Sequence, residues 1–337
     1  MSNLRTTVSR TVSTVAEALS GGSFSSKSDG RTFSDPYHPF RSEALMQEYL
    51  AFYDTRALRW PIASEERLVE TTSGTTFLRV QGPPDGPPLV LLPGDSENSL
   101  AWIPIIAALS ETYRTYALDH IYDSGRSTYR RRMGRAADLT QWLDEVLKAL
   151  ELNKPHLIGH SFGGWQAALY ARDYPDALAS LILLSPAATI LPPSMGLLAR
   201  AILHGLLPIR AYTKYYMYWY DPVGAGDDQT RPMIDELIED AMLARRCFKR
   251  RNLILPSVLS DDDWQCIKAP TFFLVGENEV TYAAKDAITK LHRVAPEIQT
   301  AIAPGADHHL TIVNRHWLTD KVLGFLSDQE VAKQSVS

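Results

Sequence analysis

The sequence is poor in cysteine and lacks any long apolar run. Its two cysteines among 337 residues, Cys247 and Cys266, match no metal-binding spacing and are too few for a disulfide framework. Cysteine usage therefore favours a reducing compartment, and we expect a cytoplasmic protein. The longest apolar candidate begins at Leu197, falls short of the roughly 18 residues that cross a bilayer, and contains Arg200 and His204. The sequence predicts no membrane-spanning helix.

Net positive charge is also absent. The formal charge is -5, which argues against general binding to nucleic acid. Apolar residues make up 45% of the chain and charged residues 22%, which is ordinary for a globular protein. The length fits one large α/β domain with an insertion, or two domains. Composition leaves the oligomeric state open.

The N-terminal region, residues 1–42, has no hydrophobic signal core. It is rich in serine, threonine and glycine, and we expect it to form a solvated, disordered tail. Arg5 and Arg10 within it suggest a weaker alternative, a transit peptide. The regular pattern of the chain begins only after residue 42.

Beyond that point, predicted strands alternate with predicted helices. The run LVLLPG from Leu89 is continuously apolar, as expected of a strand buried on both faces, whereas TFLRVQG from Thr76 predicts a half-exposed strand. The segment from Asp138 has helical spacing, with Asp138 as the expected N-cap. This alternation predicts an α/β fold with a mostly parallel sheet covered by helices on both faces. The core is expected in two parts, residues 43–188 and 265–337.

One segment, residues 189–264, contains no convincing strand and predicts several helices inserted between two strands as a cap. Its aromatic stretch, residues 212–220, places several rings along one helical face. Two interpretations stay open, namely packing of the cap onto the core and an aromatic wall over a substrate pocket. On the second interpretation, the candidate substrate-binding residues are Tyr212, Tyr216, Trp219 and Trp165.

A basic run, residues 245–251, follows an acidic run on the same predicted helix. Acidic residues early and basic residues late in a helix complement the helix dipole. We therefore expect a solvated face, and a patch for an anionic substrate or partner is the alternative.

The motif GHSFGG, residues 159–164, comes directly after an apolar strand and directly before a helix. This context is that of a nucleophile elbow, in which serine occupies a tight, strained turn. Gly159 and Gly163 fill positions where such a turn has room only for small residues, and Phe162 would supply a backbone N–H to an oxyanion. The motif identifies Ser161 as the candidate nucleophile. The alternative is a glycine-rich turn whose serine merely caps a helix.

A serine hydroxyl needs a base to accept its proton, and a histidine oriented by a carboxylate suits that task. The partners should follow the serine in the order acid, then histidine. Glu279 lies just beyond the end of a predicted strand and is the preferred acid, with Glu277 as its competitor. His308 follows the turn after the last strand and is the preferred base. His309 is then expected to face the packed side.

Together these motifs resemble the α/β-hydrolase superfamily, and more narrowly small bacterial serine carboxylesterases with a helical cap. The resemblance rests on PPLVLLPG, YRTYALD followed by GRS, GHSFGGWQA, LILLSPA, LVGENEV and PGADHH, in that order along the chain. It implies an α/β-hydrolase fold with an eight-stranded, mostly parallel sheet and a helical cap after strand six. It also implies Ser161, His308 and Glu279 as the catalytic triad, with no cofactor and no metal.

The sequence departs from that family pattern in two places. The usual His-Gly after the third strand is Pro93-Gly94 here, so a side chain that often supports this loop is missing. The backbone N–H of Asp95 should be the second oxyanion donor, and its carboxylate is expected to point away or to bind substrate. The second departure is a glutamate, Glu279, where aspartate is the commoner triad acid.

These residues predict a serine hydrolase that cleaves a small-molecule carboxylic ester or lactone through an acyl-enzyme. Other reactions of the same fold remain alternatives: carbon–carbon bond hydrolysis, thioester or amide hydrolysis, acyl transfer and cofactor-free haloperoxidation. A binding protein that has lost activity is a further alternative, disfavoured because all three triad residues are present. The aromatic cap favours a bulky apolar ester over acetate.

Overall fold

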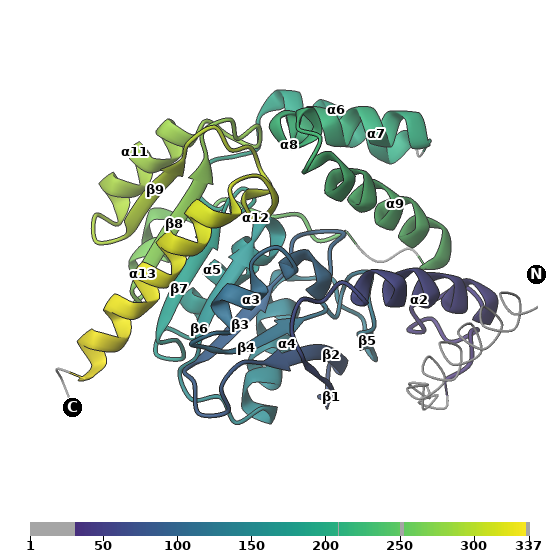
Figure 1. Ribbon diagram of the computed structural model, residues 1–337, viewed down its shortest axis with the longest axis horizontal. Helices are drawn as coiled ribbons and strands as arrows, with labels where there is room; N and C mark the ends of the chain where they lie inside the picture. Colours follow the sequence, from purple (N-terminus) through teal and green to yellow (C-terminus); the bar gives the residue numbers. More distant parts are fainter. Residues whose placement is uncertain (1–30, 208, 250–252, 335–337) are drawn as a thin grey trace, which may run out of the picture.

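A nine-stranded sheet forms the centre of the protein. The computed structural model describes residues 31–207, 209–249 and 253–334 (Figure 1). The strands run in the order β1-β2-β4-β3-β6-β7-β8-β9, with the two-residue β5 paired to β2. Their bounds are β1 (Glu65–Glu70), β2 (Gly74–Gln81), β3 (Pro88–Leu92), β4 (Arg114–Leu118), β5 (Thr128–Tyr129), β6 (His156–His160), β7 (Ser180–Leu184), β8 (Thr271–Gly276) and β9 (Gln299–Ala303).

The direction of the strands agrees with the expected α/β class. Strand β2 pairs antiparallel with β1, β4 and β5. Every pairing from β4–β3 through β8–β9 is parallel. The predicted mostly parallel sheet is confirmed, and the short β5 is additional to the eight strands expected. Because the parallel strands end at one edge, the loops that follow them meet there.

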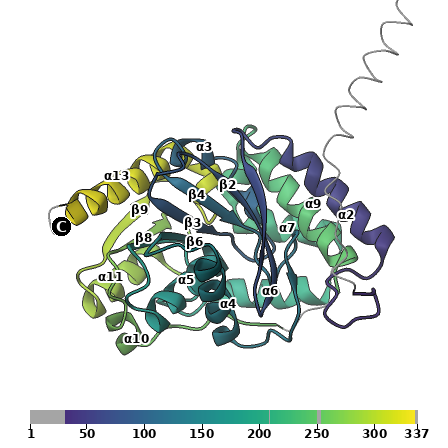
Figure 2. The same ribbon diagram turned by 90° about the horizontal axis from the view of Figure 1, so that it is seen from below.

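Helices cover both faces of the sheet (Figure 2). One face carries α4, α5, α10 and α11, and its apolar cluster includes Trp142 and Leu291. The opposite face carries α3 and α13, and its cluster includes Ile106 and Phe325. The bounds of these helices are α3 (Ile106–Leu109), α4 (Ala136–Ala149), α5 (Ser161–Asp173), α10 (Asp261–Gln265), α11 (Ala284–Val294) and α13 (Arg315–Gln334).

Strand β2 differs from its prediction as a half-exposed strand, because every one of its residues is buried. Helix α2 (Glu43–Ala57) covers one side, where the rings of Tyr53 and Phe77 meet edge to face at 6.2 Å. On the other side, Leu78 belongs to the same apolar cluster as Trp142 of α4. The alternation of polar and apolar residues predicted the wrong exposure here, because the polar side chains of this strand are buried with hydrogen-bond partners. Thr76 Oγ1, for example, accepts a hydrogen bond from Trp142 Nε1.

The start of α4 also differs from its prediction. The helix begins at Ala136, so Asp138 is its third residue and Arg135 is the N-cap. The Asp138 carboxylate instead accepts the backbone N–H groups of Gly134 and Arg135, at 3.0 and 2.9 Å. An acidic residue in the first turn satisfies free N–H groups from this position as well as from the cap.

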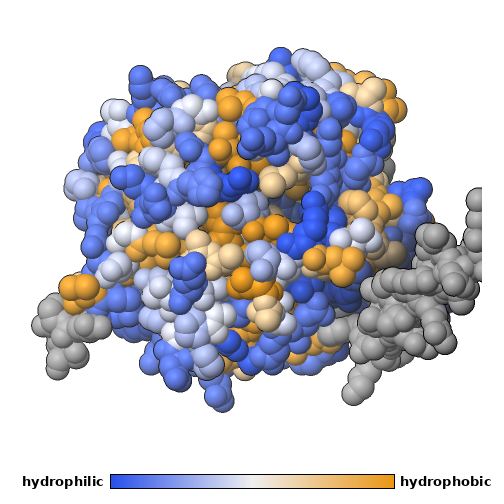
Figure 3. All heavy atoms as spheres, in the orientation of Figure 1, coloured by the Kyte–Doolittle hydropathy of each residue, from blue (hydrophilic) through white to orange (hydrophobic). Residues whose placement is uncertain are grey.

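Five helices lie between β7 and β8 in the described part of the chain. We call the first four the insertion: α6 (Met195–Leu206), α7 (Arg210–Tyr220), α8 (Pro222–Gly226) and α9 (Arg231–Cys247). Figure 1 shows them above the sheet, near α12 (Leu310–Val313). Helix α9 packs on α2, where Tyr49 donates a hydrogen bond to the buried Asp240. Helix α6 has no buried residue and exposes Met195, Ile202 and Leu206. Figure 3 shows polar and apolar groups mixed over this face of the molecule.

The expected N-terminal tail is packed in part. Residues 1–30 lie outside the described residues. From residue 31 onward the chain makes specific contacts, and Phe40 is buried against Phe248, with ring centroids 4.3 Å apart. The expectation of disorder is therefore wrong for residues 31–42, because an aromatic side chain within them completes an apolar cluster at the end of α9. Among the described residues, no helix has the length and apolar character required to cross a membrane.

Candidate active site

Ser161 occupies a sharp turn between β6 and α5. Its φ of 51° is in the left-handed region, which is strained for a residue other than glycine. A Cβ on Gly159 would lie 2.3 Å from the carbonyl oxygen of Gly163, and one on Gly163 would lie 2.3 Å from that of Pro93. Only glycine fits either position. The strand–turn–helix context predicted for the serine is therefore present, with the turn pressed against the loop that follows β3.

Glu279 and His308 lie in contact beside that turn. His308 Nδ1 is 2.8 Å from Glu279 Oε2, and both side chains are buried. Glu279 Oε1 accepts the backbone N–H of Thr281 at 2.8 Å. Burial alone would raise the pKa of Glu279, but the His308 imidazole and the hydrogen bonds from Thr281 together outweigh it and lower this pKa to about 2. Glu279 is therefore a carboxylate at neutral pH, suited to orienting the histidine.

The competing acid occupies a different position. Glu277 is exposed, and its Oε2 accepts the backbone N–H of Gly305 at 2.8 Å. It supports the turn after β9, whereas Glu279 contacts His308. The structure thus brings together the preferred acid and the preferred base from the loops after β8 and β9.

Among the described residues, Ser161 Oγ forms no hydrogen bond with His308. Catalytic hydrogen bonds are commonly long in proteins without substrate and shorten in the complex. The side chain of His160 nevertheless ties the two loops together, because its Nε2 lies 3.3 Å from the carbonyl oxygen of His308.

The two expected oxyanion donors flank the nucleophile turn. Phe162 is the second residue of α5, and the first N–H groups of a helix have no partner within it. Asp95 follows β3, on the loop that Gly163 touches. Its side chain is exposed, and Ser96 Oγ donates to it at 3.3 Å. The expectation that the Asp95 carboxylate points away from the oxyanion or binds substrate stays a prediction.

The aromatic candidates divide into two groups. Tyr212, Tyr216 and Trp219 are half-buried in the insertion, and the ring of Tyr216 stacks on His204 at 4.9 Å. Burial and then the Asp95 carboxylate raise the pKa of Tyr216 to about 12, so this tyrosine lies near the loop after β3. Trp165, in contrast, is 1% exposed and lies in the main apolar cluster behind Phe162.

Sequence analysis missed Tyr220, the last residue of α7. Its ring packs on the ring of His308 with centroids 4.5 Å apart, and its hydroxyl lies 3.2 Å from Thr281 Oγ1. Burial and then the Glu279 carboxylate raise its pKa well above the usual range. The signal was available, since Tyr220 lies four residues after Tyr216 and so continues the same helical face.

Sequence analysis also missed a buried cluster of charged and imidazole groups beside the triad. Glu97 Oε2 lies 3.1 Å from His160 Nδ1, and Glu97 Oε1 lies 3.2 Å from His309 Nε2. His309 Nδ1 is 2.6 Å from Asp221 Oδ2, at the junction of α7 and α8. His309 therefore faces inward, as expected, between two carboxylates from distant parts of the chain. No periodicity marks such loop residues, so the cluster could not be predicted from the sequence.

Charges within this cluster compensate one another. Burial would lower the pKa of His309, but the carboxylates of Asp221 and then Glu97 hold it well above its usual range. Burial would raise the pKa of Glu97, but His160 and then His309 hold it well below its usual range. Burial is the largest influence on His160, whose pKa is lowered. His309 is therefore a buried cation held between two anions.

Asp307 attaches the insertion to the histidine loop at a second point. Its Oδ2 accepts the backbone N–H groups of Val223 and Gly224, at 2.8 and 3.1 Å, in the first turn of α8. Burial and then the neighbouring Asp221 raise the pKa of Asp307 to about 6. Within the described ranges, no group of three or more His, Cys, Asp or Glu side chains is arranged to hold a metal ion.

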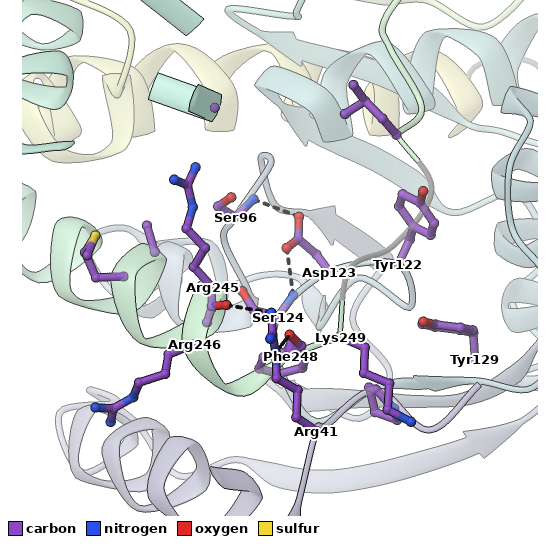
Figure 4. A pocket seen from close by; sticks show the side chains of 16 residues that line it. Arg41, Ser96, Tyr122, Asp123, Ser124, Tyr129, Arg245, Arg246, Phe248 and Lys249 are labelled. Carbon is purple, nitrogen blue, oxygen red and sulfur yellow. Dashed lines mark hydrogen bonds between the residues drawn. The ribbon is translucent and has the colours of Figure 1, made fainter. Parts of the chain in front are cut away.

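A cavity of about 700 Å³ lies beside the loop after β3, between the core and the insertion (Figure 4). On the core side Ser96 donates its backbone N–H to Asp123 at 2.7 Å. The basic run at the end of α9 contributes Arg245 and Lys249 to the opposite side. Within the described part of this run, Arg245, Arg246, Phe248 and Lys249 line the cavity, whereas Cys247 is buried. Residues 250 and 251 of the run lie outside the described residues.

Comparison with known proteins identifies the family. The family model for the alpha/beta hydrolase fold matches residues 87–208. The carboxylesterase YbfK of Bacillus subtilis (strain 168) is 30% identical over 280 residues, which cover 81% of this chain and 92% of that protein. The chain belongs to the α/β-hydrolase family. A second protein of that organism, the uncharacterized carboxylesterase nap, is 28% identical and covers 83% of this chain and 92% of its own length.

A solved structure supports the same assignment to the α/β-hydrolase family. The crystal structure of naproxen esterase, carboxylesterase NP from Bacillus subtilis, superposes with a TM-score of 0.77 at 27% sequence identity. The match covers 84% of this chain and 98% of that chain. The likeness therefore extends over most of this chain and nearly all of that one.

Proposed function

We propose that this α/β-hydrolase cleaves a carboxylic ester or lactone through an acyl-enzyme, with Ser161, His308 and Glu279 as the triad. The observation that carries the proposal is the buried 2.8 Å contact between His308 Nδ1 and Glu279 Oε2, next to a serine on a strained turn. That combination supplies a nucleophile, a base and a group that orients the base. The three relatives described above, each named a carboxylesterase, support an ester as the substrate.

In the acylation step, Ser161 Oγ attacks the carbonyl carbon of the ester while His308 Nε2 accepts the hydroxyl proton. The negative charge moves to the carbonyl oxygen, where the backbone N–H groups of Phe162 and Asp95 stabilise it. Glu279 accepts a hydrogen bond from His308 Nδ1 and stabilises the imidazolium. Collapse of the intermediate breaks the bond to the alcohol oxygen, which takes the proton from His308 Nε2.

In the deacylation step, a water molecule gives its proton to His308 Nε2 and attacks the acyl carbon. The same two N–H groups hold the second oxyanion, and the bond to Ser161 Oγ breaks as His308 returns the proton to the serine. The products are a carboxylic acid and a free enzyme. A lactone follows the same steps and gives a hydroxy acid, because its alcohol and acyl parts stay joined.

The insertion favours a bulky apolar substrate. Tyr216 and Trp219 are half-buried, and Tyr220 covers one side of His308. Aromatic side chains near a reacting group provide broad apolar contact area for an acyl or alcohol part. The relative named naproxen esterase supports a bulky ester as well.

The test is release of p-nitrophenol from p-nitrophenyl esters of increasing acyl length. We expect turnover by the native protein and a loss of about 10⁴-fold or more in Ser161→Ala, because the nucleophile is gone. Ser34→Ala, at an exposed serine far along the chain from the motif, is the matched control and should keep native turnover. Turnover by Ser161→Ala within about tenfold of native would overturn the proposal. A steep preference for the shortest acyl chain would overturn the bulky-substrate part alone.

A further inference from the structure

One buried carboxylate contacts all three loops of the site. Glu97 is 6% exposed, and its Oε2 accepts the backbone N–H of Gly94 at 2.7 Å. The same oxygen lies 3.1 Å from His160 Nδ1, and Oε1 lies 3.2 Å from His309 Nε2. Three donors from three separate loops therefore converge on two oxygens.

Each contact of Glu97 is one residue away from a group in the proposed mechanism. Gly94 precedes Asp95, whose N–H is a proposed oxyanion donor. His160 precedes the nucleophile, Ser161. His309 follows the proposed base, His308. A shift of the Glu97 carboxylate would therefore move the oxyanion loop relative to the nucleophile and the base.

The loop after β3 begins with a residue that provides no hydrogen-bond donor. Proline at position 93 has no backbone N–H and no polar side chain to hold the loop. A Cβ on Gly94 would lie 2.7 Å from Glu97 Oε2 and 3.2 Å from His160 Nδ1, so the backbone presses directly on the carboxylate and the imidazole. The Glu97 backbone N–H also bonds back to the Gly94 carbonyl oxygen at 3.3 Å, which closes a tight turn.

The far side of the cluster is fixed as well. His309 is held by Asp221 through both its backbone N–H, at 3.0 Å, and its ring Nδ1, at 2.6 Å. Buried polar groups with all partners in place define one arrangement, whereas a missing partner leaves a costly unpaired group. Glu97 is thus anchored through His309 to the start of α8.

We propose that Glu97 is a positioning residue for the reaction, which holds the oxyanion loop at residues 93–95 in register with the nucleophile turn and the histidine loop. It acts through Gly94, His160 and His309 and does not touch substrate. This inference rests on the proposed function, since it assigns a role relative to Ser161 and His308. It predicts a loss in the chemical step with little change in substrate binding.

The test compares three substitutions of Glu97 in the full chain with a p-nitrophenyl ester. Glu97→Ala removes the acceptor for Gly94, and kcat should fall about 30-fold with KM within about threefold of native, because a displaced oxyanion donor costs on the order of 10²-fold. Glu97→Gln keeps an oxygen for the Gly94 N–H and should retain kcat within about fivefold of native. Glu97→Asp is too short to reach Gly94 and should resemble the alanine variant.

A second readout separates positioning from a merely structural role. A trifluoromethyl ketone forms a tetrahedral oxyanion with the serine, so its inhibition constant should rise in parallel with the loss of kcat/KM in Glu97→Ala. Asp138→Ala is the matched control, because Asp138 is also a buried carboxylate that accepts backbone N–H groups, at the distant start of α4. It should lower thermal stability and keep native kcat.

The outcomes distinguish this inference from the proposed function. If the native protein turns over, Ser161→Ala does not, and Glu97→Ala keeps kcat within twofold, the role of Glu97 is refuted while the hydrolase function stands. If Glu97→Gln loses as much kcat as Glu97→Ala, the hydrogen bond to Gly94 is not what matters and the inference fails. If Glu97→Ala does not fold, Glu97→Asp takes its place, and its kcat is compared with that of the native protein and of Glu97→Gln in the same way. Absence of any native turnover refutes the proposed function itself.

Discussion

Tyr220 packs its ring on that of His308, with centroids 4.5 Å apart, and so joins the end of α7 to the loop after β9. The contact comes from the insertion and restricts the imidazole through ring packing alone, since the tyrosine hydroxyl lies 3.2 Å from Thr281 Oγ1 instead. A base must be held in place to accept a proton efficiently. The insertion therefore contributes to the site as well as covering it.

Tyr220→Ala should lower kcat about tenfold, because the His308 imidazole loses the aromatic ring that packs against it. Tyr220→Phe keeps the ring and should stay within about twofold of native, since the hydroxyl contacts only Thr281 among the described residues. Steady-state kinetics on a p-nitrophenyl ester measures both. Equal losses in the two variants would show that the hydroxyl, and not the ring packing, supports the histidine.

Glu279→Gln should lower kcat about a thousandfold, because a neutral amide no longer stabilises the imidazolium or fixes its tautomer. Glu277→Gln is the matched control, since Glu277 is an exposed acid on the same loop that contacts Gly305. It should keep native kcat. The reverse pattern of losses would make Glu277 the triad acid.

The buried His309–Asp221 pair predicts a dependence of stability on pH. The pKa of His309 is raised in the folded protein, so the stabilisation is fully present below the unfolded pKa of about 6.5 and is lost as pH rises toward the folded value. The stability advantage of the native protein over Asp221→Asn should therefore shrink above about pH 6.5, by up to about 1.4 kcal/mol per pH unit.

Urea unfolding between about pH 6 and pH 9 measures that advantage. Asp240→Asn is the control, because the buried Asp240 pairs with Arg56, which does not titrate in this range. The loss of unfolding free energy in Asp240→Asn, relative to the native protein, should be constant with pH. If the loss of unfolding free energy in Asp221→Asn is constant with pH as well, the assignment of His309 as a buried cation is contradicted.

Gly163→Ala should destabilise the protein by about 2–4 kcal/mol and abolish turnover. The new Cβ would lie 2.3 Å from Pro93 O and 2.5 Å from Leu92 O, so the nucleophile turn and the oxyanion loop would have to separate. Gly324→Ala, in the middle of α13 with no atom within 4 Å of a new Cβ, should instead stabilise by about 1 kcal/mol. Chemical denaturation of both variants provides the comparison, and a stable, active Gly163→Ala would be inconsistent with the tight turn.

Much of the fold could be predicted because its signals are local. The apolar runs of β3, β6 and β8 and the helical spacing of α4 can be recognised from periodicity, and strand–helix alternation predicts the sheet. The burial of β2 could not be predicted, because it depends on α2, whose contact with Phe77 joins segments far apart in the sequence. The packing of Phe40 on Phe248 joins segments far apart in sequence and was hidden for the same reason.

The candidate site could be predicted where its residues occupy strand ends with known geometry. Ser161, Glu279 and His308 each follow a strand, so topology alone brings them to one edge of the sheet. Glu97 and Asp221 lie in loops without periodicity, and their role depends on partners that only tertiary structure supplies. Tyr220 was within reach of the helical pattern and was overlooked beside Tyr216.

Trapping of the acyl-enzyme would decide whether Ser161 is the nucleophile. The native protein is quenched with acid during turnover of a p-nitrophenyl ester whose acyl group is hydrolysed slowly from the enzyme, and its peptides are then analysed by mass spectrometry. We expect the mass of the acyl group on the native peptide that contains Ser161, and we expect it to be absent from Ser161→Ala. In His308→Asn, if that variant still acylates, the acylated fraction of this peptide should be higher. An acyl mass on another residue, or steady turnover with no acyl-enzyme in any peptide while Ser161→Ala stays active, would contradict the account.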